Sequence, residues 1–111
     1  ILIYKWYMSF LNHKKIKLQK ITNSFFVPWT LALTLNSKKK PQYILEQLSK
    51  KKIEIRKGFY SADRLKIYEN NPLKLLQNSN YLSKNIICLP IHLALKKKDI
   101  EYICKIFNKI N

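Results

Sequence analysis

A single glycine, Gly58, occurs in the 111 residues of the chain. It lies in residues 53–68, IEIRKGFYSADRLKIY, where a short alternating strand pattern leads into aromatic and polar side chains. In a chain so poor in glycine, we expect glycine to be needed at this position for its backbone, because glycine permits a positive φ or the close approach of another group. One glycine also excludes the glycine-rich loops that cradle phosphate groups. We expect the chain to be organised around this stretch.

Residues 53–68 admit two interpretations. In the first, they form a strand that ends in a turn and a short helix, which is the commoner outcome because binding loops are a minority of all loops. In the second, the loop presents polar groups to a ligand, since Arg56 can fork onto a carboxylate or a phosphate. Both interpretations remain open at the level of side-chain chemistry.

The formal net charge of +16 raises the question of nucleic-acid binding. All but two of the 22 basic residues are lysine. The exceptions, Arg56 and Arg64, are the residue type best suited to bidentate contacts with bases and phosphates. The lysine runs lie at the expected ends of helices and strands, where charge is usually solvated. We therefore predict that nucleic acid is not the partner, and keep a small basic nucleic-acid-binding domain as the alternative hypothesis.

The residues that could carry metal or nucleophilic chemistry are few and scattered. Cys88 and Cys104 lack metal-ligand spacing and an activating neighbour, so we expect both to be buried hydrophobic residues in a reducing compartment. His13 and His92 lie far apart in the sequence and have no companion ligands. We assign no catalytic residue and no metal site. The longest apolar stretch, residues 25–35, is too short for a membrane span, and we predict a cytoplasmic protein without a membrane partner.

Strands and helices are both indicated along the chain. Alternation of apolar and polar residues predicts strands over residues 16–21, 29–35 and 53–56, and an apolar run predicts a buried strand over residues 86–89. The best helical pattern is the last, where apolar residues recur at i, i+3, i+4 and i+7 from Ile100 to Phe107. The other predicted helices cover residues 1–12, the turns after Pro41, residues 62–68, and a segment from an Asn78 or Ser79 cap to about residue 85 that buries Leu82 and Ile86.

Residues 53–107 resemble the C-terminal end of the DegT/DnrJ/StrS family of sugar aminotransferases, pyridoxal-phosphate enzymes with the aspartate aminotransferase fold. Lys57 and Asp63 stand about where many members have a proline and a histidine, so we transfer no substrate role to Asp63. The resemblance covers roughly residues 24–108. It rests on the order and spacing of three places: Ile53-Glu54-Ile55-Arg56 leading into Gly58-Phe59-Tyr60, Asn78-Ser79 followed by Leu82-Ser83, and Leu89-Pro90-Ile91-His92 followed by a helix that starts at Asp99.

The resemblance implies an α+β fold, a small sheet covered by helices, like the C-terminal small domain of fold-type I pyridoxal-phosphate aminotransferases. Residues 24–111 would form that domain, and residues 1–23 would be a lead-in from the end of a missing large domain. Family members transfer an amino group from glutamate or glutamine to a nucleotide-linked keto-sugar, in amino-sugar and cell-surface polysaccharide biosynthesis. The Schiff-base lysine and pyridoxal phosphate would belong to the large domain. We therefore expect this chain alone to bind no cofactor and to be inactive.

The same resemblance implies where the chain would touch a substrate. Arg56, Phe59, Tyr60 and Ser61 are expected to border the substrate pocket. The implied partners are the large domain or its chain, a nucleotide-sugar substrate, and a second copy in the homodimer of the full-length enzyme. A further hypothesis is a stand-alone domain that docks on a separate large-domain chain.

Overall fold

An antiparallel sheet forms the centre of the molecule. The structure is a computed structural model that describes residues 1–18, 27–68 and 76–111. Within these residues the sheet has four strands in the order β1-β2-β4-β3, and each neighbouring pair is antiparallel. The strands are β1 (Ile16–Leu18), β2 (Leu31–Leu35), β3 (Arg56–Lys57) and β4 (Ile86–Leu89).

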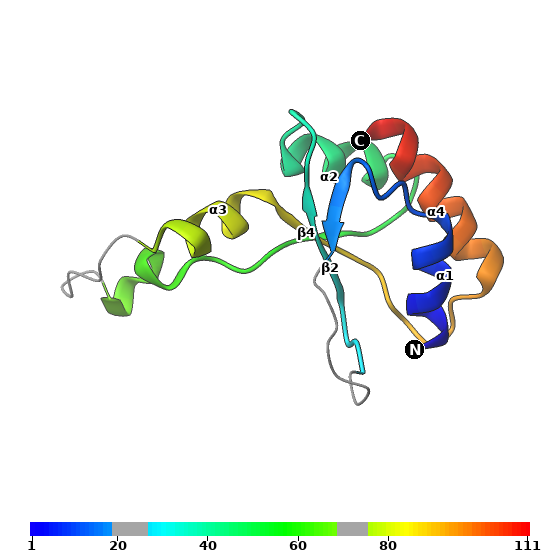
Figure 1. Ribbon diagram of the computed structural model, residues 1–111, viewed down its shortest axis with the longest axis horizontal. Helices are drawn as coiled ribbons and strands as arrows, with labels where there is room; N and C mark the ends of the chain where they lie inside the picture. The colour runs from blue at the N-terminus through cyan, green and yellow to red at the C-terminus, as the bar shows by residue number, and fades with distance from the viewer. Residues whose placement is uncertain (19–26, 69–75) are drawn as a thin grey trace.

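Three helices, α1, α2 and α4, pack against the sheet, and α3 extends away from it. Figure 1 shows α1 and α4 side by side next to the sheet, with α2 beyond one end, while α3 projects away as an arm. Two short 3₁₀ turns, η1 and η2, belong to the arm. This architecture confirms the predicted α+β fold class. The bounds are α1 (Leu2–Phe10), α2 (Pro41–Ser49), η1 (Ala62–Arg64), η2 (Lys66–Tyr68), α3 (Gln77–Asn85) and α4 (Lys97–Ile110).

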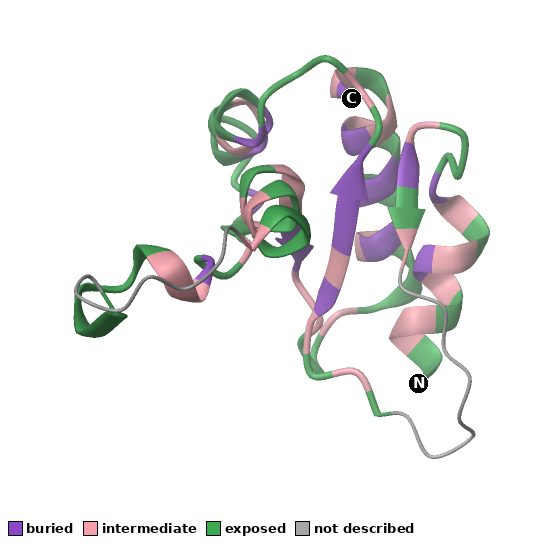
Figure 2. Cartoon of the chain, turned by 60° about the vertical axis from the view of Figure 1, so that its left-hand side comes forward, coloured by how far each residue is buried: buried purple, intermediate pink, exposed green. Residues whose placement is uncertain are grey.

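The core lies between the sheet and the helices α1, α2 and α4. The register pairs Leu31 with Leu89 and Leu33 with Ile87, so these side chains share one face of the sheet. Figure 2 shows the buried residues gathered on the central strands and on the sides of the helices that face them. Burial of each large apolar side chain contributes about 1.5–3 kcal/mol. The fully buried large side chains include Tyr7, Leu33, Ile44, Leu48, Ile87, Leu89, Ile100, Cys104 and Phe107.

Several predicted elements are confirmed because their signals are local. The helix after Pro41 has that proline in its first turn, and α4 buries the predicted residues from Ile100 to Phe107. At the start of α4, the Lys96 backbone N–H donates to the Asp99 side chain, with 2.8 Å between the nitrogen and Oδ2. The helix in residues 1–12 and the strand over residues 86–89 are likewise present. Of the predicted strand over residues 16–21, residues 19–21 lie outside the described residues.

Other element predictions are wrong, and tertiary contacts explain why. The strand expected over residues 53–56 is reduced to β3, because only Arg56 and Lys57 pair with β4 while Ile53 and Ile55 are buried in extended chain without a partner strand. The helix expected over residues 62–68 is two 3₁₀ turns, since the extended backbone of Leu65 separates them.

The prediction for α3 is wrong in its cap and its burial. Neither Asn78 nor Ser79 caps the helix, which starts at Gln77 after Leu76 and has no side-chain cap. Leu82 is 41% exposed, because the arm leaves the body of the molecule instead of packing into the core. Ile86 is half-buried as the first residue of β4.

Gly58 permits the close approach of another group. Its φ is not positive, so a left-handed conformation is not the reason for glycine here. A Cβ at this position would lie 2.4 Å from Cγ2 and 2.7 Å from Cβ of Ile86. The Gly58 N–H donates to the Ile86 carbonyl oxygen over 3.0 Å, which extends the pairing of β3 with β4 by one bond. A side chain would push this hydrogen bond apart.

Tyr7 fastens α1 to the chain that leaves β4. Its hydroxyl donates to the Pro90 carbonyl oxygen over 2.7 Å. Its side chain is fully buried, and the pKa of the Tyr7 hydroxyl is raised strongly, mainly by burial and then by the nearby Cys104. The phenol therefore stays protonated and able to donate across the accessible pH range.

The predicted domain boundary between residues 23 and 24 lies outside the described residues. The elements before it lie in the same layers as those after it, because β1 pairs with β2 and α1 packs on α4. Lys15, which precedes the predicted boundary, and Lys39, which follows it, both reach the end of α4. Lys15 Nζ donates to the Asn111 carbonyl oxygen over 2.9 Å, and Lys39 Nζ donates to the Ile110 carbonyl oxygen. These lysines satisfy helix-end carbonyls that α4 itself leaves unpaired.

We predict that Gly58→Ala destabilises the chain by about 1–3 kcal/mol, because the added methyl overlaps Ile86 and must separate β3 from β4. Urea unfolding measures the change. Ser79→Ala, on the exposed first turn of α3, is the control and should change stability by less than about 0.5 kcal/mol. Equal stability of Gly58→Ala and the wild type would contradict the close approach.

We predict that Tyr7→Phe costs about 1–3 kcal/mol in the same assay, since it leaves the Pro90 carbonyl without its donor while conserving the ring. Tyr102→Phe removes a hydroxyl from a tyrosine of α4 that is 48% exposed, and should cost less than about 0.5 kcal/mol. If the two substitutions have the same effect, the hydrogen bond from Tyr7 contributes nothing to the fold.

Candidate functional site

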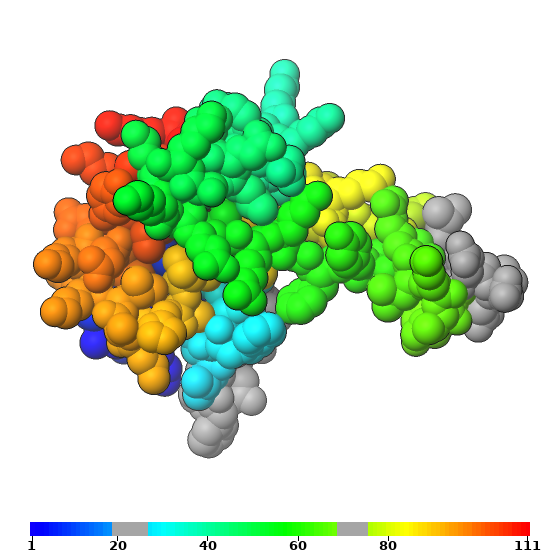
Figure 3. All heavy atoms as spheres, turned by 180° about the vertical axis from the view of Figure 1, so that it is seen from behind, coloured from blue at the N-terminus to red at the C-terminus, as the bar shows by residue number. Residues whose placement is uncertain are grey.

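A cleft of about 480 Å³ lies where three separate segments meet at one end of the sheet. These segments are the chain that enters β2, the chain that enters and leaves β3, and the chain that leaves β4. Figure 3 shows them together from behind: cyan near residue 30, green from about residue 53 to 60, and yellow-orange after residue 89. The cleft is lined by Trp29, Thr30, Glu54, Ile55, Arg56, Lys57, Phe59, Cys88, Leu89, Pro90, Ile91 and His92.

Two of the four predicted site residues line this cleft. Arg56 lies in β3 opposite Cys88 of β4, and Phe59 follows just beyond Gly58. Arg56 Nη2 lies 3.5 Å from Glu54 Oε1, but both side chains are more than 80% exposed. An ion pair so exposed contributes about 0–1 kcal/mol. The guanidinium is therefore available to an anion that enters the cleft.

The other two predicted residues lie elsewhere. Tyr60 is 76% exposed and does not line the cleft. Ser61 is buried, and its hydroxyl donates to Asp63 Oδ1. The structure thus divides the predicted set into a cleft pair and a loop pair. Their role toward a substrate stays a prediction.

Trp29 and His92 belong to the cleft and were not among the predicted site residues. Trp29 is 76% exposed, and its ring centroid lies 6.2 Å from that of Phe59 with a tilt of 48°. His92 is exposed, and its Nδ1 accepts the Ala94 N–H over 3.2 Å. The sequence pattern presents Trp29 as one more apolar strand residue. Only the antiparallel register of β2 and β4, which brings the start of one strand beside the end of the other, places Trp29 near His92.

A polar network joins the parts of the arm to one another. Asn80 Nδ2 donates to Asp63 Oδ2 over 2.7 Å, and Arg64 Nε donates to Asn80 Oδ1 over 3.0 Å. Together with the hydroxyl of Ser61, these bonds join η1 to α3. The Ser61 hydrogen bond, followed by the Asn80 hydrogen bond, lowers the pKa of the Asp63 carboxyl. Asp63 therefore acts as the ionised acceptor that connects the loop after Phe59 to the arm.

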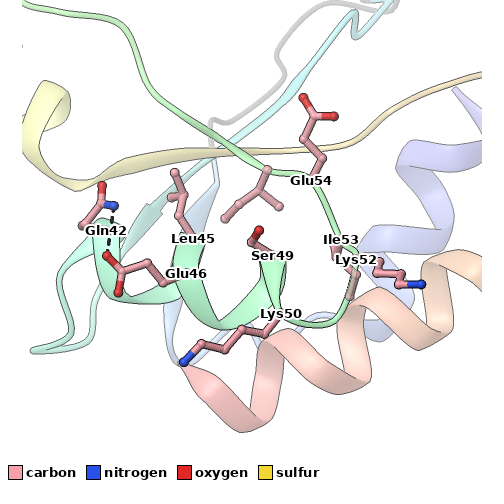
Figure 4. A pocket seen from close by; sticks show the side chains of 9 residues that line it. Gln42, Leu45, Glu46, Ser49, Lys50, Lys52, Ile53 and Glu54 are labelled. Atoms are coloured by element: carbon pink, nitrogen blue, oxygen red, sulfur yellow. Dashed lines mark hydrogen bonds between the residues drawn. The ribbon is translucent and has the colours of Figure 1, made fainter.

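Two other hollows do not bring functional groups together. One, of about 710 Å³, lies between α2 and residues 53–55, and Figure 4 shows Lys50, Lys52 and Glu54 diverging from it. Its Gln42 side chain donates to Glu46 over 3.1 Å. The other, of about 750 Å³, lies between α3 and the sheet and is lined mainly by apolar and neutral polar side chains.

The part of the chain that the structure describes contains no cluster of side chains suited to bind a metal ion or to activate a thiol. No group of three or more histidine, cysteine or acidic side chains comes together there. Cys88 and Cys104 are both buried, as predicted, and both are free cysteines. Burial raises the pKa of the Cys104 thiol to about 12. Nor does any described helix have the length and apolar character that crossing a bilayer requires.

The sequence matches a family model, and the fold matches solved structures. The model of the DegT/DnrJ/EryC1/StrS aminotransferase family matches residues 2–108. The fold is similar to that of a protein from Bacillus cereus ATCC 10987 described as a PLP-dependent aminotransferase, with a TM-score of 0.85 and 25% identity. It is also similar to the PMP form of a protein from Streptococcus pneumoniae described as a sugar aminotransferase, with a TM-score of 0.82 and 18% identity. No curated protein sequence matches the chain.

These similarities extend over almost all of this chain but a minor part of the solved structures. The match covers 96% of this chain and 30% of the Bacillus cereus protein. For the Streptococcus pneumoniae protein, the shares are 97% and 29%. The chain therefore spans about three tenths of the length of the proteins that it resembles.

We predict that acid loosens the arm. Because the pKa of Asp63 is lowered in the folded state from its ordinary value of 3.8, the stabilisation it provides is complete above 3.8 and is lost as the pH falls through the folded value. A titration from about pH 6 to about pH 2, followed by the NMR signals of the Asn80 side-chain amide, should show a midpoint below 3.8. Asp63→Asn should abolish this transition. A midpoint at or above 3.8 would contradict the network.

Proposed function

The chain belongs to the DegT/DnrJ/EryC1/StrS aminotransferase family, and on this premise we propose that it is the small C-terminal domain of a PLP-dependent aminotransferase acting on nucleotide-linked keto-sugars. The observation that carries the proposal is the extent of the match. The family model covers residues 2–108, and the fold of a PLP-dependent aminotransferase is reproduced over 96% of the chain. The loop before α3 and the ends of the central strands then face the substrate.

In this proposal, pyridoxal phosphate is bound by a larger domain, which would correspond to the part of the longer relatives that this chain does not match. The cleft residues described here do not suit the covalent attachment of the cofactor. Lys57 is the lysine that lines the cleft, and its side chain is exposed, whereas a Schiff-base lysine is activated by a desolvated or cationic setting. When bound, pyridoxal phosphate supplies the electron sink for amino transfer.

The residues of this chain would bind and orient the substrate. Arg56 offers a fork of donors to an anionic group, because its only described ion pair is a weak surface contact with Glu54. Phe59 and Trp29 present apolar surface that excludes water from one wall of the cleft. Ser61 is a positioning residue, since it acts through Asp63 to hold the loop, and Tyr60 is exposed beside it for contact with the substrate or the larger domain.

The remaining parts of the proposal follow from the family. Residues 24–111 form the small domain, and residues 1–23 lead into it from the larger one, with α1 and β1 packed on the body that follows. Two copies of the complete enzyme form a homodimer in the cytoplasm, and the amino-sugar product serves polysaccharide biosynthesis.

A hybrid enzyme tests the proposal. This chain replaces the matching 30% of the Bacillus cereus aminotransferase, and amino transfer from glutamate to nucleotide-linked keto-sugars is measured together with the cofactor spectrum. We predict that the hybrid binds pyridoxal phosphate and transfers the amino group. Arg56→Ala should lower kcat/KM about 10- to 100-fold with an unchanged cofactor spectrum, because it removes a charge-assisted contact with the substrate.

Arg64→Ala is the matched control, since the chain has two arginines and Arg64 lies on the arm, bound to Asn80. It should change kcat/KM by less than about twofold. A folded hybrid that binds pyridoxal phosphate but loses as much activity with Arg64→Ala as with Arg56→Ala would contradict the assignment of the cleft.

A further inference from the structure

We propose that the groove between α3 and the sheet is the surface on which the larger domain of the same protein docks. This inference rests on the proposed function and deepens it, because it assigns the partner domain to one surface of this chain. The length of the relatives does not indicate which face of the chain meets that domain. The exposure, charge and stability of the arm point to this groove.

The groove is open and largely apolar. It has a volume of about 750 Å³ and lies between α3 on one side and β1, β2 and the start of β4 on the other. Tyr81 and Leu82 of α3 line it, yet they are 55% and 41% exposed. Ala32 and Ile86 add apolar surface from the sheet. Large apolar side chains left accessible around one hollow are typical of an interaction site.

The groove is also poor in charge. Charged residues make up 25% of the chain. Among the ten described residues that line the groove, Lys17 is the charged one, and α3 itself carries a single charge, on Lys84. The cores of protein interfaces are depleted in charged residues and enriched in tyrosine, whereas a nucleic acid requires a basic surface. The groove therefore suits an apolar protein surface.

The helix α3 lacks the packing that stabilises the other helices. It has nine residues, no side-chain cap and no buried residue. Helices of this length are marginal in water, and most of their stability in proteins comes from a packed face. α2 has the same length but buries Pro41, Ile44 and Leu48, and α1 buries Tyr7 against α4. Among the described α-helices, α3 is the one that needs a further surface to pack on.

The arm is held in position before a partner binds. The Asn80 side chain is bonded to Asp63 and Arg64, while its neighbours Tyr81 and Leu82 line the groove. This network joins α3 to η1, and the arm extends away from the body of the molecule (Figure 1). A surface that is already ordered loses less conformational entropy on association.

The larger domain is favoured over a second copy of this chain as the occupant. The chain matches 30% of the Bacillus cereus protein and 29% of the Streptococcus pneumoniae protein, so the greater part of each lies outside the match. Two copies of this chain would each carry a formal charge of +16, and their mutual repulsion opposes association.

Hydrogen exchange measured by mass spectrometry tests the docking surface. Peptides from α3 and α4 are compared between the isolated chain and the hybrid enzyme described above, with α4 as the standard for folding because it buries four residues. We expect α4 to be protected in both proteins. The amides of α3 should exchange fast in the isolated chain and about tenfold or more slowly in the hybrid enzyme, since docking suppresses local opening.

Tyr81→Lys places a charge in the groove, and Tyr102→Lys is its matched control. Both tyrosines lie on helices and have similar exposure, 55% and 48%, but Tyr102 is on α4 and does not line the groove. Tyr81→Lys should restore fast exchange of α3 in the hybrid enzyme and leave the isolated chain unchanged. Tyr102→Lys should change neither protein.

A second format guards against a hybrid enzyme that does not fold. The Bacillus cereus protein without its matching 30% is added to this chain as a separate chain, and the exchange of α3 is measured again. Slower exchange of α3 in either format, removed by Tyr81→Lys, supports the proposal. The same fast exchange in both formats overturns it.

Two further outcomes overturn the proposal: exchange of α3 as slow in the isolated chain as in the hybrid enzyme, or protection that grows with the concentration of the isolated chain, which would assign the groove to a second copy. Exchange is measured without reference to amino transfer. An active hybrid enzyme with unprotected α3 would remove the docking surface and keep the proposed function. An inactive hybrid enzyme with protected α3 would keep the docking surface and remove the proposed function.

Discussion

The antiparallel pairing of β2 with β4 is the interaction on which the rest of the structure depends. It places Leu31 opposite Leu89 and Leu33 opposite Ile87, which builds the face that α1 and α4 cover. The same register brings the entry to β2 beside the exit from β4. Because β3 joins the free edge of β4 through two residues only, the approach of Gly58 to Ile86 sets where Arg56 lies. The core and the cleft are therefore products of one pairing.

The elements that could be predicted are those whose signals are local. The periodicity from Ile100 to Phe107 and the position of Pro41 identify α4 and α2 without knowledge of the fold. The shortness of β3 could not be predicted, because it depends on how many residues of β4 pair with it in the folded chain. The exposure of Leu82 depends on the direction in which the arm leaves the sheet. Trp29 joins the cleft through the strand register, which the sequence alone does not specify.

The positive charge has a partial structural explanation. Lys15 and Lys39 donate to carbonyl groups at the end of α4, where cations stabilise the helix dipole. Arg64 is engaged with Asn80 on the arm, and Arg56 lines the cleft. Lys15, Lys39 and Arg64 thus have specific partners within the fold, and a nucleic-acid ligand is not needed to explain these three residues. The family similarity and the cleft instead favour a domain that works against a larger one.

The most direct test of that central claim is to sequence the coding DNA upstream of Ile1 in frame. The account predicts an open frame that encodes a larger domain with a lysine suited to bind pyridoxal phosphate, since the chain spans about 30% of the Bacillus cereus protein. A stop codon directly before Ile1, in a genome without a separate gene for such a domain, would contradict it.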